Sequence, residues 1–143
     1  MEVLVEELKD ELENFNITAI QIQSDVEAKL RIAGIKVLSK EENEKIQTFR
    51  KPYLYIRINS YKPPGGREVV AFNMEVALKQ QVVLSGGHKV FGKPFYAPAW
   101  YTSVVGIVGW KNISTIRESV NSLTDQFIEA YLSMNPKTRQ GPQ

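Results

Sequence analysis

The chain has 143 residues, of which 43% are hydrophobic, 24% charged and 10% aromatic, and its net charge is +2. This length and composition fit one folded domain with its own core, and they exclude a collagen-like or disordered chain. No apolar run approaches the roughly 20 residues that a membrane-spanning helix needs. The absence of cysteine excludes disulfides, a thiolate nucleophile and a cysteine-based zinc site.

Charge is distributed unevenly along the chain. Residues 1–16 carry six acidic side chains and one lysine, whereas residues 51–111 carry eight basic side chains and two glutamates. A positive stretch attracts anionic partners over about one Debye length. Nucleic-acid-binding proteins usually show a denser run of lysine and arginine. We therefore favour the interpretation that the acidic segment folds back over the basic one.

The N-terminal region predicts one clear helix. Residues 2–8 are typical of a short strand or a helix start, and residues 9–16 of a polar connection. The spacing of Thr18 and Gln21 predicts a capping box, in which each side chain satisfies a backbone donor of the first turn. Apolar residues at helical spacing then predict a helix over residues 18–33.

A strand and a short helix are expected next. Gly34 stands where a left-handed residue commonly ends a helix. Residues 35–38 are predicted to form a short strand, which would pair in parallel with the first strand through a right-handed crossover. Ser39 and Glu42 predict a second capping box and a helix over residues 40–47.

Two alternating segments predict an antiparallel hairpin over residues 53–61 and 69–84. The segment between them, Pro63–Gly66, is typical of a turn. In the first strand, the aliphatic residues Leu54, Ile56 and Ile58 point to one face. The residues between them point to the opposite face, namely Tyr53, Tyr55, Arg57 and Asn59.

The C-terminal half predicts a third long strand and a final helix. Residues 85–88 predict a turn, residues 89–98 a loop or loosely paired edge, and residues 99–108 the strand. Gly106 and Gly109 in it indicate a bulge, weakened pairing or a close backbone approach.

The final helix is predicted over residues 112–133, because apolar residues recur there at steps of three and four. Its apolar stripe is Ile113, Ile116, Val120, Leu123, Phe127 and Tyr131, and its expected outer face is Arg117, Glu118, Asn121, Asp125 and Glu129. Residues 137–143 are expected to be a disordered tail.

These elements follow the order β-α-β-(short α)-β-β-β-α. The predicted fold is therefore an α+β two-layer sandwich, a mainly antiparallel sheet with two amphipathic helices on one face. One domain is expected over residues 1–136.

Few residues could support catalysis. His88 is the only histidine, and in its glycine-rich turn we expect it to be exposed rather than catalytic or metal-bound. Glu41, Glu42 and Glu44 are expected to form a solvated helix face. Neither glycine pair has the strand–loop–helix setting of a phosphate-binding loop. We therefore predict no enzyme activity, no catalytic residue, no cofactor and no metal.

Aromatic residues are concentrated in the basic stretch: Tyr53, Tyr55, Tyr61, Phe91, Phe95, Tyr96, Trp100 and Tyr101. Tyrosines on a strand are ordinary β-formers. A protein interface is the second interpretation, and a stacking platform for single-stranded nucleic acid or sugar rings is the third. On the first hairpin strand, Tyr53, Tyr55 and Arg57 are expected on the face without helices, joined by Trp100 or Tyr101. We predict this group to be an interaction surface.

Several segments resemble a group of small uncharacterised bacterial proteins. They are the Thr18-capped helix ending in Arg31-Ile32-Ala33-Gly34-Ile35, the strand Pro52-Tyr53-Leu54-Tyr55, the long strand Ala71–Leu84, the strand Trp100–Gly109, and the helix end at Phe127, Tyr131, Leu132, Asn135 and Pro136. The resemblance covers most of residues 18–136 and implies a secreted or periplasmic location. The element order is also similar to small α/β domains of periplasmic assembly factors, such as the N-terminal domain of the Tol translocation protein and the curli secretion factor.

We therefore expect a non-enzymatic protein-interaction domain of the bacterial envelope. It would bind a protein partner, or itself as a homodimer, by strand addition at an exposed sheet face or edge. The alternative is a binder of a small ligand, a carbohydrate or single-stranded nucleic acid through residues 51–111, with nucleic acid disfavoured. A cytoplasmic location is the alternative to a periplasmic one, since acidic residues rather than a secretion signal follow Met1.

Overall fold

The computed structural model describes residues 1–46, 51–65, 68–82 and 95–136. Its elements are β1 (Glu2–Val5), α1 (Asp10–Glu13), α2 (Ala19–Ile32), α3 (Lys40–Glu44), β2 (Tyr53–Tyr61), β3 (Val69–Val82), β4 (Phe95–Gly109), a 3-10 turn at Trp110–Asn112 and α4 (Thr115–Met134). The strands form one sheet in the order β1-β2-β3-β4, in which β1 runs parallel to β2 and the other neighbours are antiparallel. The predicted α+β class is confirmed.

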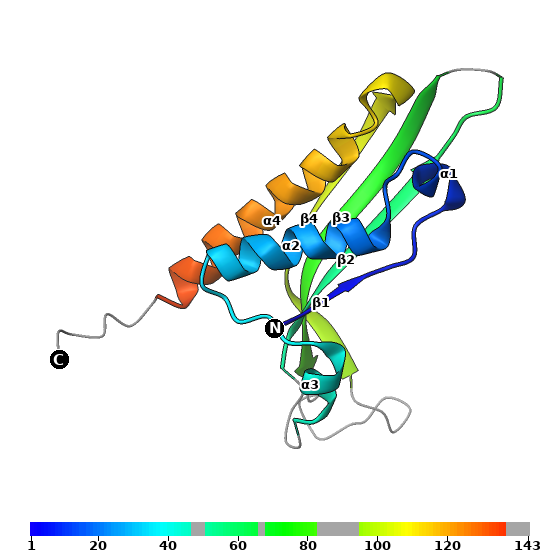
Figure 1. The fold of residues 1–143 in the computed structure, drawn as a ribbon. Coiled ribbons are helices and arrows are strands. Elements are labelled where there is room, and N and C mark those ends of the chain that lie inside the picture. Colours follow the sequence, from blue (N-terminus) through cyan, green and yellow to red (C-terminus); the bar gives the residue numbers. More distant parts are fainter. Residues whose placement is uncertain (47–50, 66–67, 83–94, 137–143) are drawn as a thin grey trace.

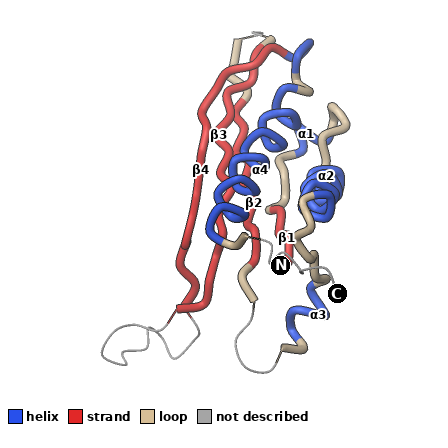
Figure 2. Tube along the Cα trace, turned by 90° about the vertical axis from the view of Figure 1, so that its left-hand side faces the viewer, coloured by secondary structure: helices blue, strands red, loops and turns tan. Residues whose placement is uncertain are grey.

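The two long helices α2 and α4 lie side by side on the same face of the sheet (Figure 1). Seen from the side, the sheet and the helices form two layers, and none of the described helices lies on the second face of the sheet (Figure 2). The sheet therefore has one covered and one open face, as predicted.

Both predicted capping boxes are present. The Thr18 hydroxyl accepts a hydrogen bond from the Gln21 N–H (3.2 Å), and the Gln21 side-chain oxygen accepts one from the Thr18 N–H (3.3 Å). Ser39 and Glu42 exchange the same pair of bonds at the start of α3. Gly34 follows α2 with a φ of 79°, a conformation that favours glycine. Local side-chain bonding therefore sets both helix starts.

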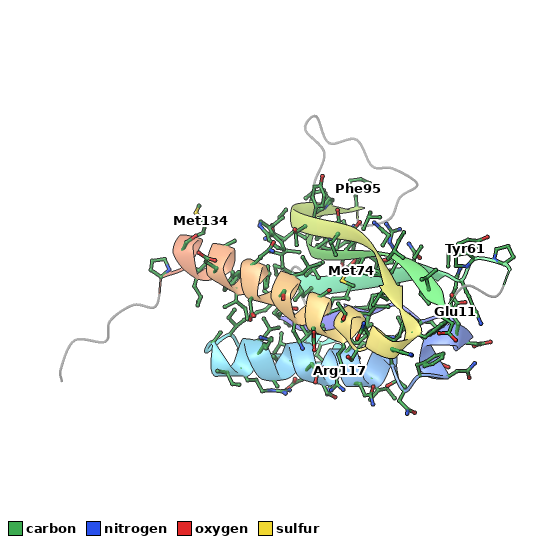
Figure 3. All side chains as sticks on the ribbon, turned by 90° about the horizontal axis from the view of Figure 1, so that it is seen from above. Glu11, Tyr61, Met74, Phe95, Arg117 and Met134 are labelled. Atoms are coloured by element: carbon green, nitrogen blue, oxygen red, sulfur yellow. The ribbon has the colours of Figure 1, made fainter. Side chains whose placement is uncertain are left out.

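The core lies between the covered sheet face and the stripe of α4. The aliphatic residues of β2 and the stripe of α4 share one apolar cluster with residues of β3. Ten residues in or against this cluster are Leu54, Ile56, Ile58, Phe72, Met74, Val76, Leu78, Val120, Leu123 and Phe127. The ring of Phe127 is 1% exposed and lies 5.4 Å from that of Trp100 and 5.6 Å from that of Tyr131. Met74 projects from the sheet toward the helices (Figure 3).

A second contact holds α4 to α2, and it corrects the predicted outer face of the last helix. Arg117 donates two hydrogen bonds to the Asp25 carboxylate on α2, at 2.5 and 2.9 Å, and Lys29 pairs with Asp125 at 2.7 Å. Figure 3 shows Arg117 where the two helices meet. The hydrogen bonds from Arg117 hold the pKa of Asp25 below its ordinary value. Arg117 and Asp125 therefore belong to the helix–helix contact rather than to a free polar face.

The strand predicted over residues 35–38 is wrong. The segment is not part of the sheet, and it makes two backbone hydrogen bonds with Met1, from Met1 N to Lys36 O (2.7 Å) and from Leu38 N to Met1 O (2.8 Å). It pairs no further, because Ser39 caps the next helix. The parallel partner of β1 is β2, with Glu2 opposite Tyr53.

Two other predicted boundaries differ. The connection predicted over residues 9–16 contains α1, which buries Leu12 completely. Residues 95–98, predicted as loop or loose edge, begin β4, with an irregularity in the register between Leu78 and Lys79. The predicted turn at 85–88 with His88, and the tail at 137–143, lie outside the described residues.

Gly106 is a site of close approach, which a side-chain ring makes rather than the predicted backbone. It pairs with Phe72 across β3 and β4, and a Cβ built on Gly106 would lie 2.6 Å from Cζ of the Phe72 ring. The ring is buried, so it has little space into which it could move. The glycine therefore makes room for the aromatic ring at the edge of the core.

Truncation of Phe127 tests the two-layer core. Phe127→Ala is expected to lower the free energy of unfolding by about 3–5 kcal/mol, because a buried aromatic ring leaves a cavity. Urea denaturation followed by circular dichroism gives the value. A loss below about 1 kcal/mol would mean that α4 packs elsewhere.

Gly106→Ala is expected to lower the free energy of unfolding by about 1–3 kcal/mol, because the added methyl group overpacks the core. Gly109→Ala is the matched control in the same strand, since its Cβ would meet only the Glu68 carbonyl oxygen at 3.6 Å. Combining Gly106→Ala with Phe72→Leu should recover part of the loss. Equal melting temperatures for the two glycine variants would contradict this packing.

Candidate functional site

The open face of the sheet is built from rows of residues that lie opposite one another on neighbouring strands. One row crosses all four strands as Leu4, Tyr55, Ala77 and Tyr101. Ala77 is fully buried on this face, because it stands between the two tyrosines. Tyr101 is therefore brought onto the same face as Tyr55, as predicted.

Tyr55 contacts an acidic and a basic side chain on this face. Its hydroxyl donates a hydrogen bond to the carboxylate of Glu6, and the Lys79 ammonium lies 5.2 Å from the centre of its ring. Burial, followed by the hydrogen bond to Glu6, raises the pKa of Tyr55 to about 12. The acidic N-terminal segment thus contacts the basic strand region at this point, in line with the favoured interpretation of the charge pattern.

Arg57 lies in the next row and is also engaged within the protein. Its guanidinium pairs with Glu75, directly opposite on β3, at 3.3 Å. Its Nε is buried and has no hydrogen-bond partner within the described part of the chain. Arg57 is therefore largely committed to the sheet itself.

The other predicted surface residues divide between the two faces. Tyr53 lies half-buried, with its ring 5.6 Å from that of Tyr96. Trp100 pairs with Leu78 on the covered face and packs against Phe127, so the structure does not bring it to the tyrosines. Strand alternation separates Trp100 from Tyr101, because consecutive residues point to opposite faces. Only Tyr101 of this pair belongs to the open face.

The most exposed apolar side chains of the open face lie on β4, which sequence analysis did not single out. Val105 is 76% exposed and Ile107 is 75% exposed. Their neighbours on β3 are Asn73 and Ala71, which are too small to cover them. The signal was present in the sequence, since Phe95–Gly109 contains no charged residue.

β4 is also an edge strand, and its main chain is exposed on one side. The hydrogen bond from Trp110 N to Glu68 O (3.1 Å) fixes the alternation, so that even-numbered residues of β4 bond to β3. The N–H and C=O groups of the odd-numbered residues point away from the sheet; these are Tyr101, Ser103, Val105 and Ile107. Among the described residues none hydrogen-bonds to them.

We name the odd-numbered residues Tyr101, Ser103, Val105 and Ile107, with their outward main-chain groups, the β4 edge. This edge combines an unpaired hydrogen-bonding ladder with an apolar stripe. Native proteins usually protect such edges with lysine, proline or a short strand. Beyond Pro98, β4 has none of these.

The opposite edge of the sheet is protected. β1 is only four residues long, and its outer side faces a groove of about 510 Å³ between β1, α2 and α3. Charged side chains line this groove, among them Glu27, Arg31 and Glu42. Short length and charge are the usual ways of preventing unwanted strand pairing. The β1 edge has both, whereas the β4 edge has neither.

No group of three or more potential metal ligands occurs within residues 1–46, 51–65, 68–82 and 95–136. Of the helices described, none has the length and apolar character that crossing a membrane requires. Comparison of the chain with protein families and with curated proteins found no match.

The Tyr55–Glu6 contact can be tested by alkaline titration. A tyrosine with a higher pKa in the folded state stabilises the fold while neutral, and this contribution is lost as the pH rises from about 10 to about 12. Tyr55→Phe should remove the tyrosine component that titrates near pH 12 in ultraviolet absorbance.

Tyr101→Phe is the matched control, because Tyr101 lies in the same row and is exposed. That variant should retain the late component. If Tyr55→Phe also retains it, the late component does not belong to Tyr55.

Proposed function

We propose that this chain is a non-enzymatic protein-interaction domain that binds an extended protein segment by strand addition at the β4 edge. Main-chain hydrogen bonds to the odd-numbered residues would supply the affinity. The apolar side chains of Tyr101, Val105 and Ile107 would supply the selectivity, since side chains of an added strand alternate with the same period.

The observation that carries the proposal is that no described residue protects the edge along residues 99–109. An exposed, uncharged, apolar edge strand pairs readily with other strands, so a soluble protein keeps one only where a partner covers it. Tyr101 and Ile107 are 65% and 75% exposed, and contiguous apolar patches of this kind commonly mark interaction sites.

The rival function, binding of nucleic acid or sugar through residues 51–111, has weaker support. Arg57 is paired with Glu75, Lys79 lies over Tyr55, and Lys62 lies 5.2 Å from the centre of the Trp110 ring. These cations contact the protein's own acidic and aromatic groups. Phosphate binding needs cations that are open to a ligand.

An envelope location is part of the proposal. Its support is the resemblance, over most of residues 18–136, to a group of small uncharacterised bacterial proteins, which implies a secreted or periplasmic location.

The test is selection of extended peptides from a random displayed library on the immobilised wild-type chain. Val105→Pro removes one outward N–H and no hydrogen bond of the β3–β4 ladder, because proline is tolerated on edge strands where the N–H faces solvent. We expect the selected peptides to bind Val105→Pro at least about tenfold more weakly.

Val105→Ala is the matched control at the same site, since it loses the side chain but keeps the N–H. It should bind more tightly than Val105→Pro. Ser103→Pro tests the same edge if Val105→Pro melts early. Selected peptides that bind wild type and both proline variants equally would overturn the proposal.

A further inference from the structure

We propose that the occupant of the β4 edge is a second copy of this chain, paired antiparallel through β4 about a two-fold axis at Val104. This inference rests on the proposed function and names its partner. The result is a continuous sheet across two copies, with all four long helices on one face.

Charge favours a second copy. Residues 95–109 carry no charge, so two β4 strands meet without like-charge repulsion at any register. The charged residues beside this strand on the open face already have partners within one copy. Glu75 pairs with Arg57, and Lys79 lies over the Tyr55 ring. A chain with a net charge of only +2 adds little long-range repulsion.

The register follows from the exposed side chains. An axis at Val104 places Tyr101 opposite Ile107 of the second copy, and Ser103 opposite Val105 of the second copy. Aromatic and β-branched side chains are favourable cross-strand pairs. This register covers each of the large exposed residues, whereas an axis at Val105 would leave Tyr101 opposite Gly109. All four pairing residues have outward main-chain groups, so each pair can exchange hydrogen bonds.

The helix layer fits the same axis. α4 packs over both β3 and β4, so its axis lies about 5 Å from the proposed two-fold when strands are about 4.8 Å apart. Two copies then hold their α4 helices about 10 Å apart, which is close to the usual distance of 8–10 Å between packed helices.

Each copy carries a groove where these helices would meet. It has a volume of about 340 Å³ and runs along α4 beside β4, and its lining includes Val104, Glu118, Ser119, Ser122 and Gln126. Val104 at the axis therefore belongs to the groove that the second copy's α4 would face. The side chains of Ser119 and Ser122 are short and leave room there, while the longer Glu118 and Gln126 line the same groove.

The area is sufficient for a stable dimer. Residues 99–109 span about 37 Å at about 3.4 Å per residue. A sheet layer and a helix layer, each about 10 Å thick, give a cross-section of roughly 740 Å² per copy. Specific interfaces bury about 800 Å² per partner.

Sedimentation equilibrium across a dilution series tests the assembly. The wild type is expected to be a dimer, and Val105→Lys is expected to raise the dissociation constant at least about tenfold, because it brings two like charges, one from each copy, to diagonal positions about 7–8 Å apart on the open face. Ile20→Lys is the matched control, since Ile20 is 79% exposed on α2, away from β4. Equal association of the two variants would overturn the interface.

Disulfide cross-linking tests the register, and the absence of native cysteine makes it unambiguous. Tyr101→Cys mixed with Ile107→Cys should form cross-linked heterodimers on mild oxidation, because directly opposite Cα atoms lie about 5.5 Å apart. Neither variant alone should cross-link, since the equivalent cysteines of the two copies are then six residues, or about 20 Å, apart along the strands. Self-cross-linking of Ile107→Cys would overturn this register.

The two proposals can fail separately. A chain that stays monomeric at every concentration but binds peptides in a Val105-dependent manner overturns the dimer and retains strand addition. A dimer that survives Val105→Lys, together with peptide binding that survives Val105→Pro, overturns both.

Discussion

Burial of the α4 stripe against the sheet is the contact on which the two-layer arrangement depends. Phe127 and Val120 are about 1% exposed, and Met74 beneath them is fully buried. α4 is joined to α2 by Arg117 and Asp25, so the two helices cover the sheet as one layer. Because both long helices lie on one face, no long helix of the described residues covers the other.

The open face can therefore be covered only by side chains of the sheet itself. The strands differ in how far their side chains cover it. Over β2 and β3, tyrosines and ion pairs close the surface, as Tyr55 does over Ala77. Over β4 nothing comparable occurs, since Val105 and Ile107 stand beside small residues. The open face is therefore polar and self-contained at its centre, and apolar at one margin.

Most of the fold could be predicted from local signals. Capping boxes at Thr18 and Ser39 and the strict alternation of residues 53–61 are short-range patterns, and each was confirmed at or within a few residues of its boundary. The prediction of a strand at residues 35–38 was wrong, because whether a segment becomes a strand depends on its pairing partner. Here the partner is Met1, which is distant in the sequence. α1 was missed because a single buried residue, Leu12, holds it.

The candidate site was harder to predict, because strand order decides it. The sequence placed Tyr53, Tyr55 and Arg57 on the correct face, but it could not tell that β2 lies inside the sheet while β4 lies at its edge. Trp100 and Tyr101 were open alternatives until the register with β3 fixed their faces. An uncharged 15-residue strand becomes informative only once its edge position is known.

The same edge position bears on which partner it favours. The β4 main chain is already held in extended form by its hydrogen bonds to β3, so β4 loses little conformational entropy when a partner binds. A disordered peptide must still lose about 1–2 kcal/mol of backbone entropy for every residue that it fixes. A second folded copy brings an edge that is equally preorganised, and its α4 adds contacts that a single strand lacks. Preorganisation on both sides is therefore the physical reason why self-pairing competes well with strand addition by an unstructured partner.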